Sequence, residues 1–207
     1  IRQSLVGSEM CIRDRHRLAW ASCKIKTDFT DEKIIIPRKS ALELQKLLNL
    51  YPDNVNIAFN SNQLKVFSDE YTFISKLIEG SYPDYEKVFP KGTEQKLKAN
   101  KSLVQTALNR AAVLSNEKYR GVKFILEKDN LKICANNPSK ESAEEEVLVE
   151  YSGDSFEIGF NISYVQESLS VISNNEVEFV FFGSENSCLV KNIDDESLIH
   201  VIMPMRL

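Results

Sequence analysis

The chain is poor in the residues that usually mark catalytic or metal-binding sites. Its 207 residues include two histidines, four cysteines and seven glycines. His16 and His200 stand far apart, and neither has a cysteine, Ser-x-Gly or paired-carboxylate context that would indicate a nucleophile or a general base. The glycines are scattered, so no glycine-rich phosphate loop is present. We therefore expect no catalytic residue, no metal and no cofactor.

The spacing of the cysteines and the lack of long hydrophobic runs exclude further classes of protein, whereas the net charge excludes none. Cys11, Cys23, Cys134 and Cys188 form no C-x-x-C pair, which argues against a zinc site or a disulfide framework and favours a reducing, cytoplasmic location. No run approaches the roughly 18 apolar residues of a membrane helix, so no membrane partner is expected. The net charge of -4 is mild, and it neither favours nor excludes DNA because one face of a protein can be basic.

The last seven residues, Val201–Leu207, are apolar and contain two methionines. A chain end of this kind is unusual, because termini are commonly polar and frayed. Flexible thioethers are typical of surfaces that accept several partners. The end of the chain therefore predicts a binding module.

One pattern occurs three times from about residue 32 onward: a short apolar strand, an amphipathic helix and three strands, about 60 residues in all. Alternating and apolar runs predict strands at 34–36, 55–59, 64–67, 71–77, 97–99, 122–126, 131–135, 144–151, 156–160, 177–182, 188–190 and 198–203. Helical spacing predicts helices over 40–50, 101–114 and 162–172. We expect Asn100 and Asn161 to be N-caps, and Ser40 and Glu43 to form a capping box.

These units predict an α+β fold with antiparallel sheets on one side and helices on the other, because one unit can bury its helix only against another unit. The second and third copies together form a domain over about 89–207. The first copy needs an upstream partner, whose last strand we expect at 17–23. Residues 1–15 lack periodicity, and we expect them to be a non-native leader.

Seven segments carry a family resemblance: 16–19, 36–39, 82–85, 114–122, 135–138, 159–165 and 203–207. In their order and spacing they resemble the bacterial DNA polymerase III beta subunit, the sliding clamp. The resemblance implies a DNA-clamp fold, and a head-to-tail homodimeric ring around duplex DNA with two repeats in each of three domains. It assigns 16–86 to the second half of the middle domain and 87–207 to the C-terminal domain. The family has Asp-Gly where this chain has Asp14-Arg15.

The resemblance also implies a cleft that docks short peptides from the DNA polymerase III catalytic subunit, the clamp loader, and repair and translesion polymerases. Its matching positions are His16, Arg17, Leu18, Pro83, Lys87, Val88, Tyr119, Asn161, Tyr164, Val201, Ile202, Met203, Pro204, Met205, Arg206 and Leu207. Lys87 stands where the best-known member has arginine, which can weaken bidentate contacts. The alternative is that Pro83, Tyr85 and the terminal strand only close a seam between domains.

Two further surfaces follow from the resemblance. Candidates for sequence-independent phosphate contact are Arg38, Lys39, Lys46, Lys101 and Arg110, although ordinary solvated helix charge explains them equally well. Candidates for the dimer interface are Val113, Leu114, Glu141, Glu144, Glu145 and Glu146. The acidic residues can instead protect a sheet edge.

We thus expect a non-catalytic clamp that confers processivity on the polymerase. One alternative is a metal-dependent nucleic-acid-processing enzyme such as a nuclease, which would need clustered carboxylates in a cleft. The other is an inactive clamp fragment that cannot close a ring.

Overall fold

The computed structural model describes residues 2–3, 16–24, 33–51, 54–81, 84–116, 118–139, 141–193 and 195–206. The helices are α1 (Arg38–Leu50), α2 (Lys101–Val113), α3 (Ile162–Ser170) and the 3-10 helix η1 (Tyr85–Val88). The strands are β1 (Arg2–Gln3), β2 (Arg17–Ala21), β3 (Cys23–Lys24), β4 (Asn56–Phe59), β5 (Gln63–Phe67), β6 (Thr72–Lys76), β7 (Gln95–Asn100), β8 (Gly121–Glu127), β9 (Asn130–Asn136), β10 (Ser142–Leu148), β11 (Glu150–Tyr151), β12 (Phe156–Asn161), β13 (Glu176–Phe181), β14 (Cys188–Asn192) and β15 (Asp195–Ile202).

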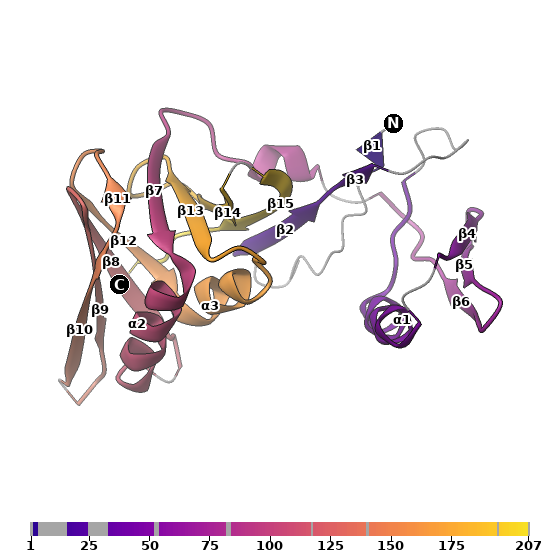
Figure 1. The fold of residues 1–207 in the computed structure, drawn as a ribbon, viewed down its shortest axis with the longest axis horizontal. Helices are drawn as coiled ribbons and strands as arrows, with labels where there is room; N and C mark the ends of the chain where they lie inside the picture. The colour runs from indigo at the N-terminus through magenta and orange to yellow at the C-terminus, as the bar shows by residue number, and fades with distance from the viewer. Residues whose placement is uncertain are drawn as a thin grey trace.

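Figure 1 shows a larger lobe, built from the second and third repeats, and a smaller lobe with α1 and β4–β6. In the larger lobe the two repeats exchange their first strands. β7, from the second repeat, pairs with β13 of the third, and β12, from the third, pairs with β8 of the second. The resulting antiparallel sheets have the orders β10-β9-β8-β12 and β11-β7-β13-β14-β15-β2. Each repeat therefore completes the sheet of the other.

The hydrophobic core of the larger lobe lies between these sheets and the adjacent helices α2 and α3. The ring of Phe124 on β8 lies 5.4 Å from that of Phe160 and 6.3 Å from that of Phe179. All three rings are fully buried, and burial of each stabilises the fold by about 2 kcal/mol. Because Phe124 and Phe179 come from different sheets, this contact joins the two repeats.

The two asparagine caps are confirmed, and the capping box is wrong. The Asn100 side chain accepts from the backbone N–H groups of Ser102 and Leu103, and that of Asn161 accepts from Ser163. Helix α1 instead begins directly after Pro37, without a side-chain cap. Pro37 itself occupies the N-cap position. Its fixed φ is compatible with the start of a helix, but its side chain has no acceptor atom, so the first N–H groups of α1 receive no side-chain hydrogen bond.

Most predicted bounds differ from the structure by a few residues, and three differences have an evident physical reason. Residues 34–36 are not a strand, although Ile78 donates its N–H to the Ile35 carbonyl at 2.9 Å. Helix α3 ends at Ser170 rather than 172, and the Lys101 ammonium donates to the free Ile172 carbonyl at 2.7 Å. The predicted strand 144–151 is divided at Val149, because the chain leaves β9 there and joins β7 in the other sheet.

Strand β2 extends the six-stranded sheet of the larger lobe. It pairs antiparallel with β15, from Arg17 opposite Ile202 to Ala21 opposite Leu198. Leu18, in the middle of this pairing, is buried. A segment that precedes the first repeat thus contributes directly to the sheet of the third repeat, next to the end of the described chain.

Candidate partner-docking site

Residues 203–206, which follow β15, are attached at two points. The Met203 N–H donates to the His16 carbonyl, and the Met205 N–H donates to the Gly159 carbonyl, both at 2.8 Å. The first bond ties the segment to His16, the residue directly before β2, and the second ties it to β12. Met203, Pro204 and Met205 remain half-buried rather than fully covered. The segment therefore lies along the surface in a defined position with its apolar side chains accessible.

Arg17 of β2 links this segment to helix α3. Its guanidinium lies 4.6 Å from the ring centroid of Tyr164 and forms an ion pair with Glu167. Tyr164 and Glu167 are three residues apart and therefore share one face of α3. A cation over an accessible aromatic ring contributes about 0.5–1 kcal/mol. Glu167 was not among the cleft residues predicted from the sequence. The one sequence feature that could have indicated it is its i, i+3 spacing from Tyr164, which places both residues on the same face of the helix.

His200 lies within the same part of the sheet. On β15 it stands opposite Ala19 of β2 and Val190 of β14. Its Nε2 atom is buried and has no hydrogen-bond partner in the described part of the chain. Burial, together with the positive charge of Arg17, lowers the pKa of His200 from 6.5 to about 4. At neutral pH the imidazole is therefore uncharged.

The turn at residues 118–120 is fixed against the start of α3. The Asn161 amide donates to the Tyr119 carbonyl at 3.3 Å, and the Arg120 guanidinium donates to the Ser163 hydroxyl at 2.9 Å. Arg120 has a positive φ of 48°, and its N–H donates to the Asn116 carbonyl at 2.7 Å. This backbone turn leaves the Tyr119 side chain 57% exposed beside the helix.

The 3-10 helix η1 reaches β2 through the residue that follows it. Phe89 and Trp20 pack edge to face, with ring centroids 6.5 Å apart. Val88 is half-buried, whereas Lys87 is exposed and pairs with Asp84 at 3.0 Å. Pro83 and Leu207, both predicted for the cleft, lie outside the described residues.

We call the following set the docking surface: His16, Arg17, Tyr119, Gly159, Asn161, Tyr164 and 203–206. The buried members Leu18, Val201 and Ile202 of the predicted cleft lie beneath it in the sheet. The contacts described above bring the accessible members together from β2, β12, α3 and two loops. Their chemistry is that of a recognition site, with apolar and aromatic side chains and a few fixed polar groups.

The predicted DNA-facing residues are in different situations. Arg110 makes two hydrogen bonds to Glu145, at 2.8 and 2.5 Å, which raises the pKa of Arg110 and lowers that of Glu145. Lys46 pairs with Glu43 at 3.0 Å. Arg38 and Lys39 are exposed in the first turn of α1. Arg110, a candidate DNA-facing residue, thus binds Glu145, a candidate interface residue. This ion pair was not predicted from the sequence.

The remaining candidate interface residues lie around the end of α2 and on β10. Val113 is exposed, Leu114 is half-buried, and Glu141 and Glu146 are exposed. Glu144 pairs with Lys132 of β9 at 2.7 Å. Within the described residues, no three His, Cys, Asp or Glu side chains are grouped as metal ligands.

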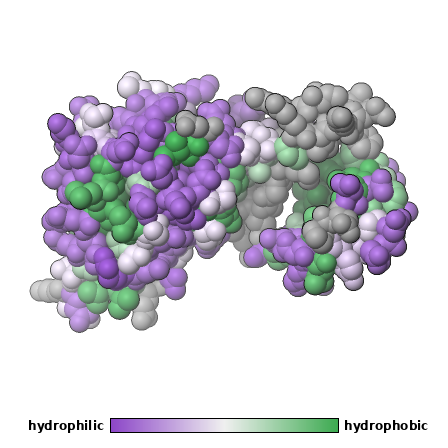
Figure 2. All heavy atoms as spheres, in the orientation of Figure 1, coloured by the Kyte–Doolittle hydropathy of each residue, from purple (hydrophilic) through white to green (hydrophobic). Residues whose placement is uncertain are grey.

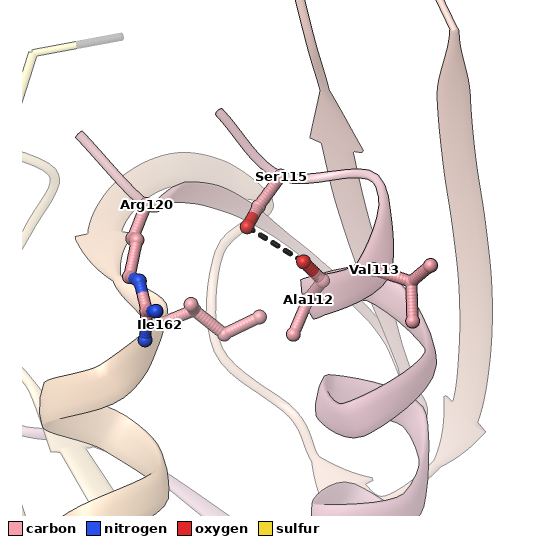
Figure 3. Close-up of a pocket in the computed structure, with 5 residues that line it drawn as sticks. All are labelled: Ala112, Val113, Ser115, Arg120 and Ile162. Carbon is pink, nitrogen blue, oxygen red and sulfur yellow. Dashed lines mark hydrogen bonds between the residues drawn. The ribbon is translucent and has the colours of Figure 1, made fainter. Parts of the chain in front are cut away.

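A hollow of about 500 Å³ lies between the end of α2 and the start of α3. Its lining residues are Ala112, Val113, Ser115, Arg120 and Ile162. Figure 3 shows Arg120 and Ile162 on one side and the end of α2 on the other, with the Ser115 hydroxyl donating to the Ala112 carbonyl at 2.8 Å. The predicted interface residue Val113 and Arg120, which follows Tyr119 of the docking surface, therefore both line this hollow.

Comparison with known families identifies both parts of the chain. The family described as "DNA polymerase III beta subunit, C-terminal domain" matches residues 86–206, and the one described as its central domain matches residues 7–84. This chain belongs to the beta sliding clamp family. The Pseudomonas aeruginosa beta sliding clamp is 43% identical over 195 residues, and that of Escherichia coli K12 is 39% identical over 194. Each alignment covers 94% of this chain and 53% of the relative.

Solved clamp structures have the same fold. The Pseudomonas aeruginosa DNA polymerase III beta subunit superimposes with a TM-score of 0.90 at 43% identity, over 93% of this chain and 53% of that one. The Caulobacter crescentus beta subunit gives a TM-score of 0.87 at 31% identity, over 94% and 53%. The α+β fold predicted from the repeats, and the DNA-clamp fold that the family resemblance implied, are thereby confirmed. The chain spans about half the length of the relatives that it matches.

No helix in the described portion of this clamp chain is long and apolar enough to cross a membrane.

Proposed function

We propose that this chain acts as part of a non-catalytic DNA sliding clamp that holds the DNA polymerase III catalytic subunit on duplex DNA in the cytoplasm. The docking surface binds short peptide segments of that polymerase, of the clamp loader, and of repair and translesion polymerases. The observation that carries this proposal is the attachment of residues 203–206 to both His16, which directly precedes β2, and β12, next to Tyr164.

The composition of the docking surface suits a short peptide with apolar and amide side chains. Met203 and Met205 are accessible and can repack around different apolar side chains. Tyr119 and Tyr164 supply aromatic surface, which is enriched in binding hot spots. Arg17 is held by Tyr164 and Glu167, so it supplies donors without further ordering.

Ring assembly and DNA contact belong to the same proposal. We place the boundary between the middle and C-terminal domains at residues 86–87, where η1 connects the lobes. In the assembled homodimeric ring, Val113 and Leu114 contact a second subunit, together with the carboxylates of β10. Arg38, Lys39 and Lys46 face DNA phosphates, and Lys101 and Arg110 add positive potential while bound to protein acceptors. Such contacts are independent of sequence, as sliding requires.

Titration calorimetry with a short glutamine- and leucine-containing clamp-binding peptide tests peptide docking. We expect Tyr164→Ala to weaken binding at least about tenfold, as is usual for an aromatic hot spot. Deletion of residues 205–207 should abolish binding. Leu148→Ala is the matched control, because Leu148 is a large exposed apolar residue on β10, outside the docking surface. Equal affinity of the native and Tyr164→Ala proteins would refute the proposed site.

A further inference from the structure

The six-stranded sheet of the larger lobe buries apolar side chains on both of its faces. Phe179 and Val190 stand opposite each other on one face and belong to the core beside α2 and α3. Val180 and Val201 alternate with core residues along β13 and β15, so they point to the other face together with Leu18, which stands opposite Val201. All three are at most 1% exposed, and Figure 2 shows a mostly hydrophilic surface over the larger lobe. The sheet therefore has a second cover, on the face away from the helices.

Phe89, directly after η1, contributes to this second cover. It packs edge to face on Trp20 of β2, with ring centroids 6.5 Å apart and an interplanar angle of 87°. Trp20 lies two residues from Leu18 and stands opposite Ile199, so it belongs to the same face of the sheet. Both rings are half-buried. Phe89 thus attaches the segment that connects the lobes to β2.

The opposite face of β2 carries part of the docking surface. Arg17 stands opposite Ile202, and its guanidinium lies against the ring of Tyr164. Directly before β2, the His16 carbonyl accepts from the Met203 N–H. A displacement of β2 would therefore move both the Arg17 side chain and the point at which residues 203–206 are attached.

Phe89 also fixes the end of η1. Val88, a predicted cleft residue, directly precedes it and is half-buried. The neighbouring Lys87 pairs with Asp84, but both residues belong to the connecting segment, so this ion pair does not attach the segment to β2. The contact between Phe89 and Trp20 therefore sets the position of Val88 relative to β2.

We propose that Phe89 is a positioning residue of the docking surface. Packed on Trp20, it holds β2 and the end of η1 in the arrangement that a docked peptide meets. This role rests on the proposed peptide docking. Without the Phe89 ring, β2 occupies this arrangement for only a fraction of the time, and the apparent affinity for the peptide falls by that fraction. The usual strength of an edge-to-face pair corresponds to a change of about two- to tenfold.

Titration calorimetry with the glutamine- and leucine-containing peptide tests this role. We expect Phe89→Ala to weaken binding about two- to tenfold. Phe89→Leu should bind more nearly like the native chain, because leucine keeps an apolar contact with Trp20. Tyr51→Ala is the matched control. It removes one ring of the Tyr51–Tyr71 pair in the smaller lobe, whose centroids are 5.5 Å apart, and it should leave the affinity unchanged.

Two further measurements distinguish positioning from a general loss of stability. Trp20 is the single tryptophan of the sequence, and its fluorescence emission should move to longer wavelength in Phe89→Ala as water reaches the ring. Amide hydrogen exchange at residues 17–21 should become faster in this variant, while β8 and β9 keep their native rates. By linkage, saturating peptide should slow exchange at residues 17–21 more in Phe89→Ala than in the native chain.

The outcomes separate this role from the proposed function. Native affinity in Phe89→Ala overturns the positioning role and leaves peptide docking intact. Weaker binding with faster exchange throughout β8 and β9 also overturns it, because the effect is then a general destabilisation. A native chain that binds no peptide refutes both the proposed docking and the role of Phe89 in it.

Discussion

The pairing of β2 with β15 should depend on pH through His200, whose imidazole is largely buried between β2 and β14. The perturbation we consider is acidification, compared between the native protein and His200→Gln. Because the pKa of His200 is lowered in the folded protein, the unfolded chain takes up a proton at a higher pH than the folded chain does. The free energy of unfolding therefore falls as the pH decreases from 6.5 toward 4, and the loss is complete below the folded pKa.

The size of the effect follows from the two pKa values. The gap between 6.5 and about 4 corresponds to about 3 kcal/mol, at about 1.4 kcal/mol per pKa unit. Burial is the larger cause and the charge of Arg17 the smaller one. Replacement of Arg17 by methionine should therefore recover only a minor part of the gap.

Urea unfolding between pH 7 and pH 4 measures this contribution. Carboxylates also titrate in this range. The informative quantity is therefore the difference between the native protein and His200→Gln in how much the free energy of unfolding changes with pH. On acidification, we expect the free energy of unfolding of His200→Gln to fall by about 3 kcal/mol less than that of the native protein. His16→Gln is the control, because it removes the other histidine, which is exposed. A His200 imidazole proton resonance that titrates near pH 6.5 in the folded protein would refute the reasoning.

Three further predictions concern the core, a helix cap and DNA. Phe124→Ala removes a fully buried ring that contacts both sheets, and it should lower the free energy of unfolding by about 3–5 kcal/mol in urea titrations. Asn100→Ala removes the acceptor for two N–H groups at the start of α2, and should cost about 1 kcal/mol. Glu145→Gln releases Arg110 from its carboxylate partner and should tighten binding to duplex DNA in a salt-dependent way, measured by fluorescence anisotropy. An unchanged affinity would mean that Arg110 does not face DNA.

The repeats and the helices could be predicted from sequence because they depend on local patterns. The spacing of Ile162, Val165 and Leu169 places one face of α3 in the core, and all three are buried. Asn100 and Asn161 cap their helices as predicted. The capping rule failed at Ser40, because α1 begins at Arg38 and its N-cap is Pro37, three residues before the predicted cap.

Features that depend on contacts between distant segments could not be predicted in this way. The apolar run 34–36 has the composition of a strand, but strand formation also requires a neighbouring edge. The exchange of β7 and β12, and the addition of β2 to β15, join residues that are 30 or more positions apart. The ion pair of Arg110 with Glu145 spans 35 positions. Residues of the docking surface were found through family resemblance, whereas the contacts of Arg17 with Tyr164 and Glu167 required the structure.

The most direct test of peptide docking is the location of a bound peptide by amide chemical-shift mapping of the 207-residue chain. Addition of the glutamine- and leucine-containing peptide should shift the amide resonances of residues 16–18, 119, 159–164 and 203–206 together. Strands β9 and β10 should remain unaffected. Shifts confined to those strands or to the smaller lobe, with residues 203–206 unchanged, would contradict the account.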